Sequence, residues 1–335
     1  MSASGSSPRD PSALFLVDKP SGPTSHDIVQ QLRRWTGLRR VGHGGTLDPL
    51  ATGLLPIFVG RATRLIEYLG EHRKHYTATI TLGVQTDTDD AEGTAIFQAP
   101  VPALRLADLD QALAPFRGIV QQTPPAFSAV KVGGVTAHRA ARRGEPLEIA
   151  AREVTVHALT ANEWDAPQLR VAMTVSTGTY VRAIARDLGL GLGCGGHVVE
   201  MRRVGIGPVT VDDAHTPQAL ESAFTAGTGW DLATPLIRFF EHWPRVIPSA
   251  AQRGQLLNGQ AVPVSLGGSA GGGARETRST GDGPAGDEPA GDETASRAAL
   301  HALAVDRLGT PIAVLVPEPG WPERWRPSKV LIGRG

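Results

Sequence analysis

The residue best suited to covalent chemistry is Asp48, in the glycine-rich stretch Val-Gly-His-Gly-Gly-Thr-Leu-Asp-Pro at residues 41–49. Glycines at three of the seven preceding positions let this loop bring its backbone close to a ligand. Pro49 favours extended backbone at Asp48 and supplies no N–H donor. Two interpretations stay open at this point. The Asp-Pro pair forms an ordinary turn, or the loop presents a carboxylate as nucleophile or base with His43 nearby.

Signatures of cofactor and metal sites are incomplete in this chain. Residues 191–196, Gly-Leu-Gly-Cys-Gly-Gly, have the spacing of a dinucleotide-binding turn but follow a predicted helix rather than a strand. Residues 86–93 begin like a calcium loop, yet Glu92 stands where that loop requires glycine. His72 and His75 have no second group of ligands at metal-site spacing. We therefore expect no cofactor and no metal.

Composition places the chain among soluble globular proteins. Its 335 residues are 41% hydrophobic and 20% charged, and the length suggests two or three domains. The single cysteine, Cys194, excludes an internal disulfide and a multi-cysteine zinc site. No apolar run approaches the roughly 18 residues that span a membrane. We expect a cytoplasmic protein that does not contact a membrane.

Periodicity predicts the elements that must position Asp48. Thr24 is a good helix N-cap with Asp27 three residues later, and the apolar spacing continues to Trp35. Residues 76–82 alternate apolar and threonine side chains, which is typical of a strand with one buried face. Further strands are predicted near 154–159 and 169–175, and a helix over 181–188. Strands outnumber helices without a strict βαβα order, so the class is α+β with a mixed, mostly antiparallel sheet.

Two segments have the composition of disordered chain. Residues 1–12 are rich in Ser, Gly and Pro. Residues 264–297 repeat Gly, Ala and acidic residues without an aromatic, so they cannot bury enough apolar surface to offset their ordering entropy. Strand-like alternation returns from Leu300. We expect a disordered tail and a disordered insertion within a C-terminal domain.

Charge is balanced overall but uneven along the chain. The 33 basic residues equal the 33 acidic ones, which excludes a uniformly basic nucleic-acid coat. Residues 33–76 nevertheless hold eight basic residues against three acidic ones. A solvated charged face and an RNA-binding surface both fit this pattern, and charge alone does not separate them.

Residues 42–65, GHGGTLDPLATGLLPIFVGRATRL, make the chain recognisable. They resemble the catalytic motif of the TruB family of tRNA pseudouridine-55 synthases, whose usual form is G-H-x-G-x-L-D-P-x-A-x-G-x-L. The resemblance covers most of the chain as far as Gly207. Further ordered matches lie at residues 17–20, 74–76, 82–93, 123–131, 178–182 and 193–203.

The resemblance implies the roles of individual residues. Asp48 is the nucleophile of uridine isomerisation. Arg182 pairs with Asp48 and keeps the carboxylate ionised, since an adjacent opposite charge lowers the pKa of an aspartate. Tyr76 stacks on the flipped uracil and takes part in proton transfer. Core packing remains the alternative for Tyr76 and for Tyr180. The substrate-binding residues that the resemblance implies are His43, Tyr76, Tyr180, Met201 and Lys19.

The same resemblance implies a domain plan and a substrate. Residues 13–240 form the pseudouridine synthase catalytic domain, and residues 241–335 form a PUA-like, β-rich RNA-binding domain. The substrate is the uridine at position 55 in the TΨC loop of tRNA, which is extruded by base flipping. The protein binds the TΨC arm, and nothing demands more than a monomer.

One departure from the family and two rival functions accompany this prediction. Asp90 follows Asp89, one acidic residue more than the family usually has, and we expect it to lie outside the catalytic set. A tRNA-binding folding chaperone with incidental catalysis is the main alternative function. A hydrolase that uses Asp48 is disfavoured, because no acid–base partner stands at a recognisable spacing.

Overall fold

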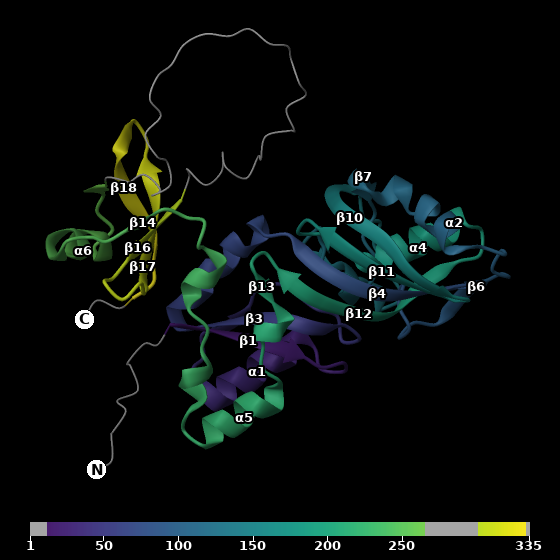
Figure 1. Cartoon of the computed structure of the whole chain (residues 1–335), viewed down its shortest axis with the longest axis horizontal. Helices are drawn as coiled ribbons and strands as arrows, with labels where there is room; N and C mark the ends of the chain where they lie inside the picture. Colours follow the sequence, from purple (N-terminus) through teal and green to yellow (C-terminus); the bar gives the residue numbers. More distant parts are fainter. Residues whose placement is uncertain (1–11, 265–300, 333–335) are drawn as a thin grey trace, which may run out of the picture. The chain divides into compact units, whose positions relative to one another are not determined.

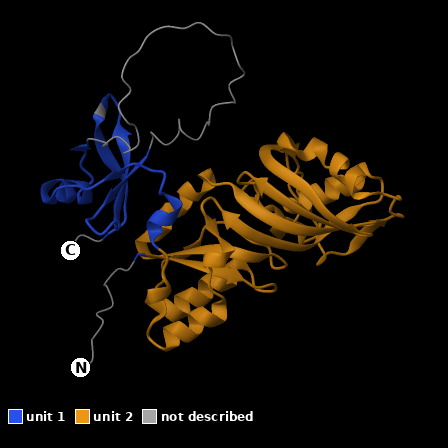
Figure 2. Ribbon diagram, in the orientation of Figure 1, with its two compact units in different colours: residues 1–12, 235–335 blue, residues 13–234 orange. Residues whose placement is uncertain are grey.

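The computed structural model describes residues 12–264 and 301–332, apart from the side chain of Pro322. It divides into two compact units, one of residues 13–234 and one that begins at Pro235 and includes Ser12 (Figure 2). The predicted disordered tail, except Ser12, and the predicted insertion, except Val264, lie outside the described residues. Within the described ranges, no helix combines the length and apolar character needed to cross a membrane.

The larger unit is built on one nine-stranded sheet (Figure 1). Its strand pairs are antiparallel except β3 with β12, which run parallel. This arrangement confirms the predicted α+β class with a mixed, mostly antiparallel sheet. The main strand order is β1 (Ala13–Lys19), β3 (Thr52–Val59), β12 (Gly196–Ile206), β4 (Lys74–Leu82), β11 (Gln168–Val175), β10 (Arg152–Asp165) and β7 (Gly118–Gln122), with β2 (Val41–His43) beside β3 and β13 (Val209–Thr210) beside β12.

Helix α1 (Ser25–Thr36) begins where the sequence predicts. The Thr24 hydroxyl accepts a hydrogen bond from the Asp27 amide at 3.1 Å, and the Asp27 carboxylate accepts one from the Thr24 amide at 2.8 Å. These two bonds satisfy backbone donors that the first helical turn leaves unpaired. Gly37 ends the helix in the left-handed conformation that glycine adopts without strain.

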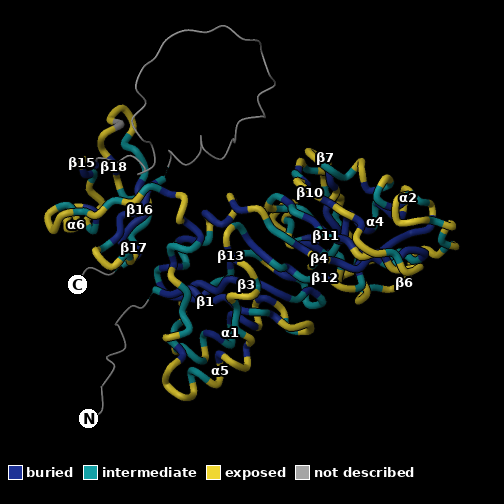
Figure 3. Tube along the Cα trace, in the orientation of Figure 1, coloured by how far each residue is buried: buried dark blue, intermediate teal, exposed yellow. Residues whose placement is uncertain are grey.

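The main core cluster lies on one face of the sheet, while β1 and β3 are buried on both faces. Tyr76, Ala78, Ile80 and Leu82 of β4 are buried there, as their alternation predicts. Apolar residues of α1, α2 (Leu106–Ala112), α4 (Val181–Gly191) and α5 (Pro217–Thr225) belong to the same cluster. Figure 3 shows buried positions concentrated along the central strands. The remaining elements of this unit are β5 (Val84–Thr86), β6 (Ala95–Gln98), β8 (Lys131–Val132), β9 (Val135–Thr136), α3 (Ala137–Ala141) and the 3-10 segments Gly60–Glu71, Ala114–Phe116, Val211–Asp213 and Gly229–Leu232.

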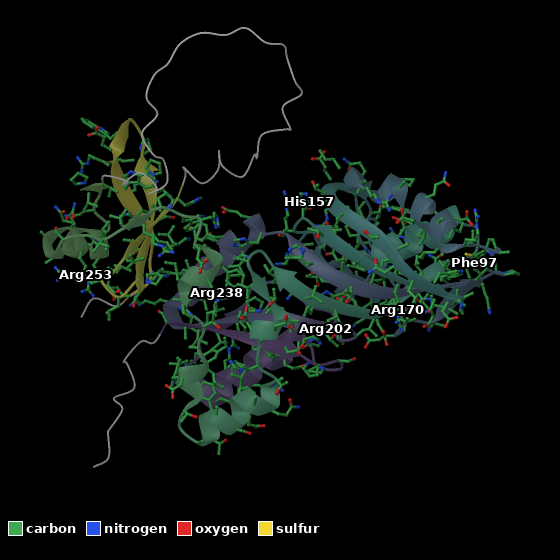
Figure 4. The ribbon with its side chains drawn as sticks, in the orientation of Figure 1. Phe97, His157, Arg170, Arg202, Arg238 and Arg253 are labelled. Atoms are coloured by element: carbon green, nitrogen blue, oxygen red, sulfur yellow. The ribbon has the colours of Figure 1, made fainter. Side chains whose placement is uncertain are left out.

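On the central strands β4, β11 and β12, the other face of the sheet carries polar side chains. A groove of about 730 Å³ on this face is lined by Thr77, Thr79 and Glu200, among others. Arg170 and Arg202 also line it and are labelled in Figure 4. Arg170 pairs with Glu163 at 2.8 Å. Tyr76 lies on the opposite, core-facing side of β4.

The smaller unit has its own sheet and core. Five strands follow the order β14 (Arg245–Val246), β16 (Ala302–Val305), β17 (Pro311–Glu318), β18 (Trp321–Val330) and β15 (Val262–Pro263). Helix α6 (Ala250–Leu257) contributes the buried Leu256 to a cluster with Leu315 and Trp325, and Leu236–Phe239 is a 3-10 segment. The structure confirms that the C-terminal region is rich in β-strands.

Candidate active site

The loop that carries Asp48 connects β2 to β3 and is fastened to the start of α1. The Ser25 hydroxyl donates to the Leu47 carbonyl at 2.9 Å and accepts from the Leu47 amide at 2.8 Å. The Gly22 amide donates to the Pro49 carbonyl at 3.0 Å. Bonds on both sides of Asp48 therefore hold its backbone in place, while 31% of its side chain stays exposed. This geometry suits a group that must meet a substrate in a fixed orientation.

Lys19 belongs to the fastening of this loop. Its side chain is fully buried, and its ammonium donates to the carbonyls of Pro20, Pro23 and Pro49 at 2.9, 2.7 and 3.1 Å. Burial lowers the pKa of Lys19 to about 8. All three donors of a lysine are used by these carbonyls. The sequence places Lys19 among substrate-binding residues, but here it has the geometry of a positioning residue for the Asp48–Pro49 turn.

Arg182, at the start of α4, meets Asp48. The distance from Arg182 Nε to Asp48 Oδ2 is 3.0 Å, and Arg182 is 3% exposed. The guanidinium also donates to the carbonyls of Thr88 at 2.7 Å and Phe127 at 2.9 Å. Anchors from two other segments thus fix the orientation of this cation, because a planar guanidinium bonded at several edges cannot rotate freely.

The structure corrects the expectation that Asp90 lies outside the catalytic set. Asp90 Oδ2 is 3.4 Å from Arg182 Nη1, so one arginine contacts both Asp48 and Asp90. Asp90 is 4% exposed. Sequence reasoning missed it because the acidic run at residues 86–93 contains several carboxylates, and only the fold selects the one that reaches Arg182.

The ionisation of Asp48 also differs from expectation. The sequence predicts that Arg182 lowers the pKa of Asp48. In the structure, burial raises the pKa of Asp48 above its ordinary value, and Asp90 raises it further, although Arg182 and Lys19 act in the opposite direction. Desolvation outweighs the ion pair because the carboxylate loses more hydration than one charged neighbour restores. Removing protons from Asp48 therefore takes a higher pH than for an exposed aspartate.

A second buried pair lies one helical turn further along α4. Arg186 Nη1 is 3.1 Å from Asp89 Oδ2, and Arg186 also donates to the Thr123 carbonyl at 2.9 Å. Burial raises the pKa of Asp89 to about 6. Asp89 has φ = 61°, in the left-handed region that aspartate and asparagine tolerate better than most residues. This pair holds the strained turn from which Asp90 extends.

Tyr180 is held by two residues that sequence reasoning did not single out. The Gln122 side chain accepts from the Tyr180 amide at 2.7 Å and donates to the Tyr180 carbonyl at 3.1 Å. Arg152 lies over the Tyr180 ring at 4.9 Å from the ring centre and donates to the Gly178 carbonyl at 2.8 Å. The only signal for Gln122 was its place beside the matched residues 123–131, so its role depends on the fold.

The remaining predicted site residues lie on neighbouring strands. Tyr76 of β4 and Met201 of β12 are each 8% exposed and belong to the same core cluster. The core-packing alternative therefore describes most of the Tyr76 surface. His43 ends β2, and its Nδ1 is buried without a hydrogen-bond partner in the described structure. Burial and the nearby Arg203 lower the pKa of His43, so the imidazole is neutral at physiological pH.

The site supplies an oriented carboxylate beside a fixed cation, next to aromatic and apolar surface. In the parts of the chain that the structure describes, no group of three His, Cys, Asp or Glu side chains is placed to hold a metal ion. A carboxylate in such a setting can act as a nucleophile or as a base.

Comparison with known proteins connects this geometry to a family. The family model for the N-terminal domain of TruB family pseudouridylate synthases matches residues 33–181. The model for the C-terminal domain of tRNA pseudouridylate synthase B matches residues 182–236.

Several curated relatives share the name tRNA pseudouridine synthase B. The chain is 53% identical to the one from Synechococcus sp. strain WH7803 over 58% of this chain and 65% of that protein. It is 48% identical to the one from Thermobifida fusca strain YX over 63% of this chain and 75% of that protein. It is 44% identical to the one from Aromatoleum aromaticum over 76% of this chain and 82% of that protein.

Solved structures agree at the level of the fold. A chain in the crystal structure of a Cbf5-Nop10-Gar1 complex aligns with a TM-score of 0.67 at 23% identity, covering 96% of this chain and 85% of that one. A second, in the structure of an H/ACA RNP bound to a substrate RNA containing 2′-deoxyuridine, aligns at 0.65 and 20% identity, covering 96% and 86%. From the Asp48 loop, the two family models and these relatives, we conclude that the chain belongs to the TruB family of pseudouridylate synthases.

Proposed function

We propose that this protein isomerises the uridine at position 55 in the TΨC loop of tRNA to pseudouridine, with Asp48 as nucleophile. The observation that carries the proposal is the 3.0 Å contact between the Asp48 carboxylate and the buried Arg182. The tRNA substrate follows from the names of relatives at 44–53% identity. A tRNA substrate also favours the cytoplasm as the place of action.

The reaction breaks the bond between the sugar C1′ and N1 of uracil and forms a bond between C1′ and C5. N1 gains a proton and C5 loses its hydrogen to solvent, so the reaction needs no external oxidant or reductant. A carboxylate nucleophile allows the uracil to detach, rotate and rejoin. The base must first leave its stack, which costs a few kcal/mol. Stacking of the uracil against the rings of Tyr76 and Tyr180 offsets that cost, at about 1–3 kcal/mol per base.

We assign the other predicted residues by their places. Met201 forms part of the apolar floor beside Tyr76, and His43, at the end of β2, helps to hold the RNA loop. Lys19 positions the catalytic turn. Residues 13–240 are proposed as the catalytic domain and residues 241–335 as a PUA-like domain that binds tRNA. The proposed enzyme works as a monomer without cofactor.

The test is tritium release from unmodified tRNA that carries 5-tritiated uridine. Wild type is expected to release tritium and Asp48→Asn is expected to release none. Asp165→Asn, which changes an exposed aspartate at the end of β10, is the matched control and is expected to react as wild type.

The other outcomes separate the alternatives. Release by both wild type and Asp48→Asn would refute the assignment of the nucleophile. Tight tRNA binding with no release by either protein would favour the folding-chaperone function. Release from a tRNA in which only uridine 55 is labelled checks the position.

A further inference from the structure

A buried cation behind the catalytic loop has no carboxylate partner. Arg203 is 1% exposed, and its guanidinium donates to the carbonyls of Leu54 at 2.7 Å, Gly45 at 3.1 Å and Thr46 at 3.5 Å. Within residues 12–264 and 301–332, no acidic side chain lies within ion-pair distance of it. Arg182 and Arg186, by contrast, each meet two aspartates. A buried charge without a counter-charge is costly and favours binding of an opposite charge.

Lys74 lies beside this cation, next to Gly45 of the loop that carries Asp48. Its ammonium donates to the Thr177 hydroxyl at 3.2 Å, and no carboxylate pairs with it in the described part of the chain. Lys74 begins β4 and precedes Tyr76 by two residues, so both side chains leave the same face of the strand. Thr177 precedes Tyr180 by three residues. Lys74 therefore joins the two segments that carry the predicted aromatic site residues.

A glycine keeps open the small space between the two cations. A Cβ atom added to Gly45 would lie 3.5 Å from Arg203 Nη1 and 3.9 Å from Lys74 Nζ. Gly45 has φ = +126°, a conformation that residues with side chains rarely adopt. The amides of Gly45 and Thr46 make no hydrogen bond to any described residue. Two cations therefore lie next to a loop segment whose two backbone amides have no hydrogen-bond partner among the described residues.

The electrostatics of this space favour an anion. Burial lowers the pKa of Lys74 to about 8, and the neighbouring Arg203 contributes to the decrease. An anion next to Lys74 would oppose both effects and keep the ammonium protonated. A phosphodiester carries one negative charge and presents acceptor oxygens, which match an ammonium and backbone N–H groups.

We propose that Lys74, the Gly45–Thr46 backbone and the buried Arg203 form a subsite for a single phosphodiester of the RNA, next to the nucleotide that enters the catalytic site. The subsite rests on the proposed function, because it needs an RNA substrate. Lys74 contacts the phosphate directly. The donors of Arg203 are occupied by carbonyls, so Arg203 contributes its charge and shapes the Gly45–Thr46 loop.

The first experiment tests whether the Lys74 side chain contacts one particular phosphate of the RNA. The affinity of full-length wild type and Lys74→Met is measured for an unmodified TΨC stem-loop RNA and for versions with one neutral methylphosphonate at each linkage near the target uridine. Lys74→Met is expected to bind the ordinary RNA up to about tenfold more weakly, with a salt slope smaller by about one. With the correct linkage neutralised, wild type and variant are expected to bind equally. If Lys74→Met loses the same affinity for every RNA, or loses no affinity at all, the subsite is refuted.

Two controls keep the result specific. Lys74→Arg retains the charge and is expected to recover most of the affinity. Arg170→Met removes a cation from the opposite face of the sheet and is expected to bind as wild type. Thermal unfolding of each variant checks that the fold is intact. Tritium release by wild type tests the proposed function separately from the subsite. If wild type releases tritium and Lys74→Met binds RNA with unchanged affinity, only the subsite is refuted.

A second experiment distinguishes RNA from a free anion. The chain has four lysines, and the lowered pKa of Lys74 makes its amine reactive toward acetylation near pH 8. Mass spectrometry of the Lys74 peptide is expected to show protection by the stem-loop RNA and none by the same concentration of inorganic phosphate. Equal protection by inorganic phosphate would assign the space to a free anion and overturn the RNA assignment.

Discussion

Replacing Arg182 by methionine tests how the protein sets the ionisation of Asp48, its proposed nucleophile. Arg182 lies 3.0 Å from one oxygen of Asp48 and 3.4 Å from one oxygen of Asp90. It opposes the increase that burial and Asp90 cause in the pKa of Asp48. Without it, two carboxylates share a poorly hydrated space with no cation between them. The pKa of Asp48 must then increase further.

The size of the effect follows from the contact distance. An opposite charge within about 4–6 Å typically changes the pKa of a carboxyl by one to three. The reactive form is the carboxylate, so activity is present above the pKa of Asp48 and is lost as the pH falls through it. Arg182→Met is therefore expected to move the acid limb of the pH–rate profile upward by about one to three pH units. Below that limb, each pH unit corresponds to about a tenfold lower rate.

The assay is single-turnover tritium release at saturating RNA across the pH range in which the protein stays folded. Arg182→Lys keeps the charge but loses the contacts with the Thr88 and Phe127 carbonyls. It is expected to lower the rate at every pH while leaving the acid limb closer to that of wild type. Arg186→Met is the matched control on α4, because Arg186 pairs with Asp89 and Asp187 rather than with Asp48.

A uniform loss of rate in Arg182→Met with an unmoved acid limb would refute this reasoning. It would mean that Arg182 orients Asp48 without governing its protonation. A comparable displacement in Arg186→Met would show that any lost charge on α4 has the same effect. Thermal unfolding must accompany both profiles, because removing one partner of a buried ion pair costs about 3–5 kcal/mol.

Three further predictions concern the framework of the site. Gln122→Ala removes both side-chain bonds to the Tyr180 backbone and leaves the Tyr180 amide unpaired, while the Tyr180 carbonyl keeps its bond from the Ile184 amide. We therefore expect about 1–3 kcal/mol less stability in urea unfolding, with lower turnover. Unchanged stability and turnover would contradict the clamp. Gly53 has φ = +97°, and a Cβ atom added to it would lie 2.3 Å from the Arg203 carbonyl oxygen of β12, so we expect Gly53→Ala to lower Tm strongly. Gly70 has open space around it, so Gly70→Ala is the control and should fold normally. Burial raises the pKa of Asp89 in the folded protein to about 6, against an ordinary 3.8, so the folded state binds more protons than the unfolded state. The free energy of unfolding of wild type should therefore fall by on the order of 2–3 kcal/mol as the pH rises from about 4 to 6, and Asp89→Asn should not show this decrease. An identical pH dependence of stability in both proteins would contradict this prediction.

Local chemistry made several features predictable from the sequence. The Thr24 and Asp27 cap and the alternation of β4 were correct because each depends on residues adjacent in the chain. The Asp48 motif identified the family for the same reason, since its glycines, histidine and Asp-Pro pair stand in one short run. The α+β class followed from counting such local patterns.

Local sequence patterns did not predict the contacts between segments that are distant in the chain. Arg182 meets the Thr88 carbonyl across 94 positions, and Gln122 meets Tyr180 across 58. No local period indicates which carboxylate in residues 86–93 reaches Arg182. Only the folded chain shows that Asp90 is the carboxylate of this segment that contacts Arg182.

The sequence by itself determined which family the chain belongs to and which residues are proposed to react, because residue type and short spacing carry that information. Only the tertiary structure decided how those residues are charged. The pKa of Asp48 is raised rather than lowered, and Arg203 has no acidic partner among the described residues, because ionisation depends on how much water the fold removes and on which charges it brings near. Desolvation belongs to the assembled site as a whole, and no single stretch of sequence contains it.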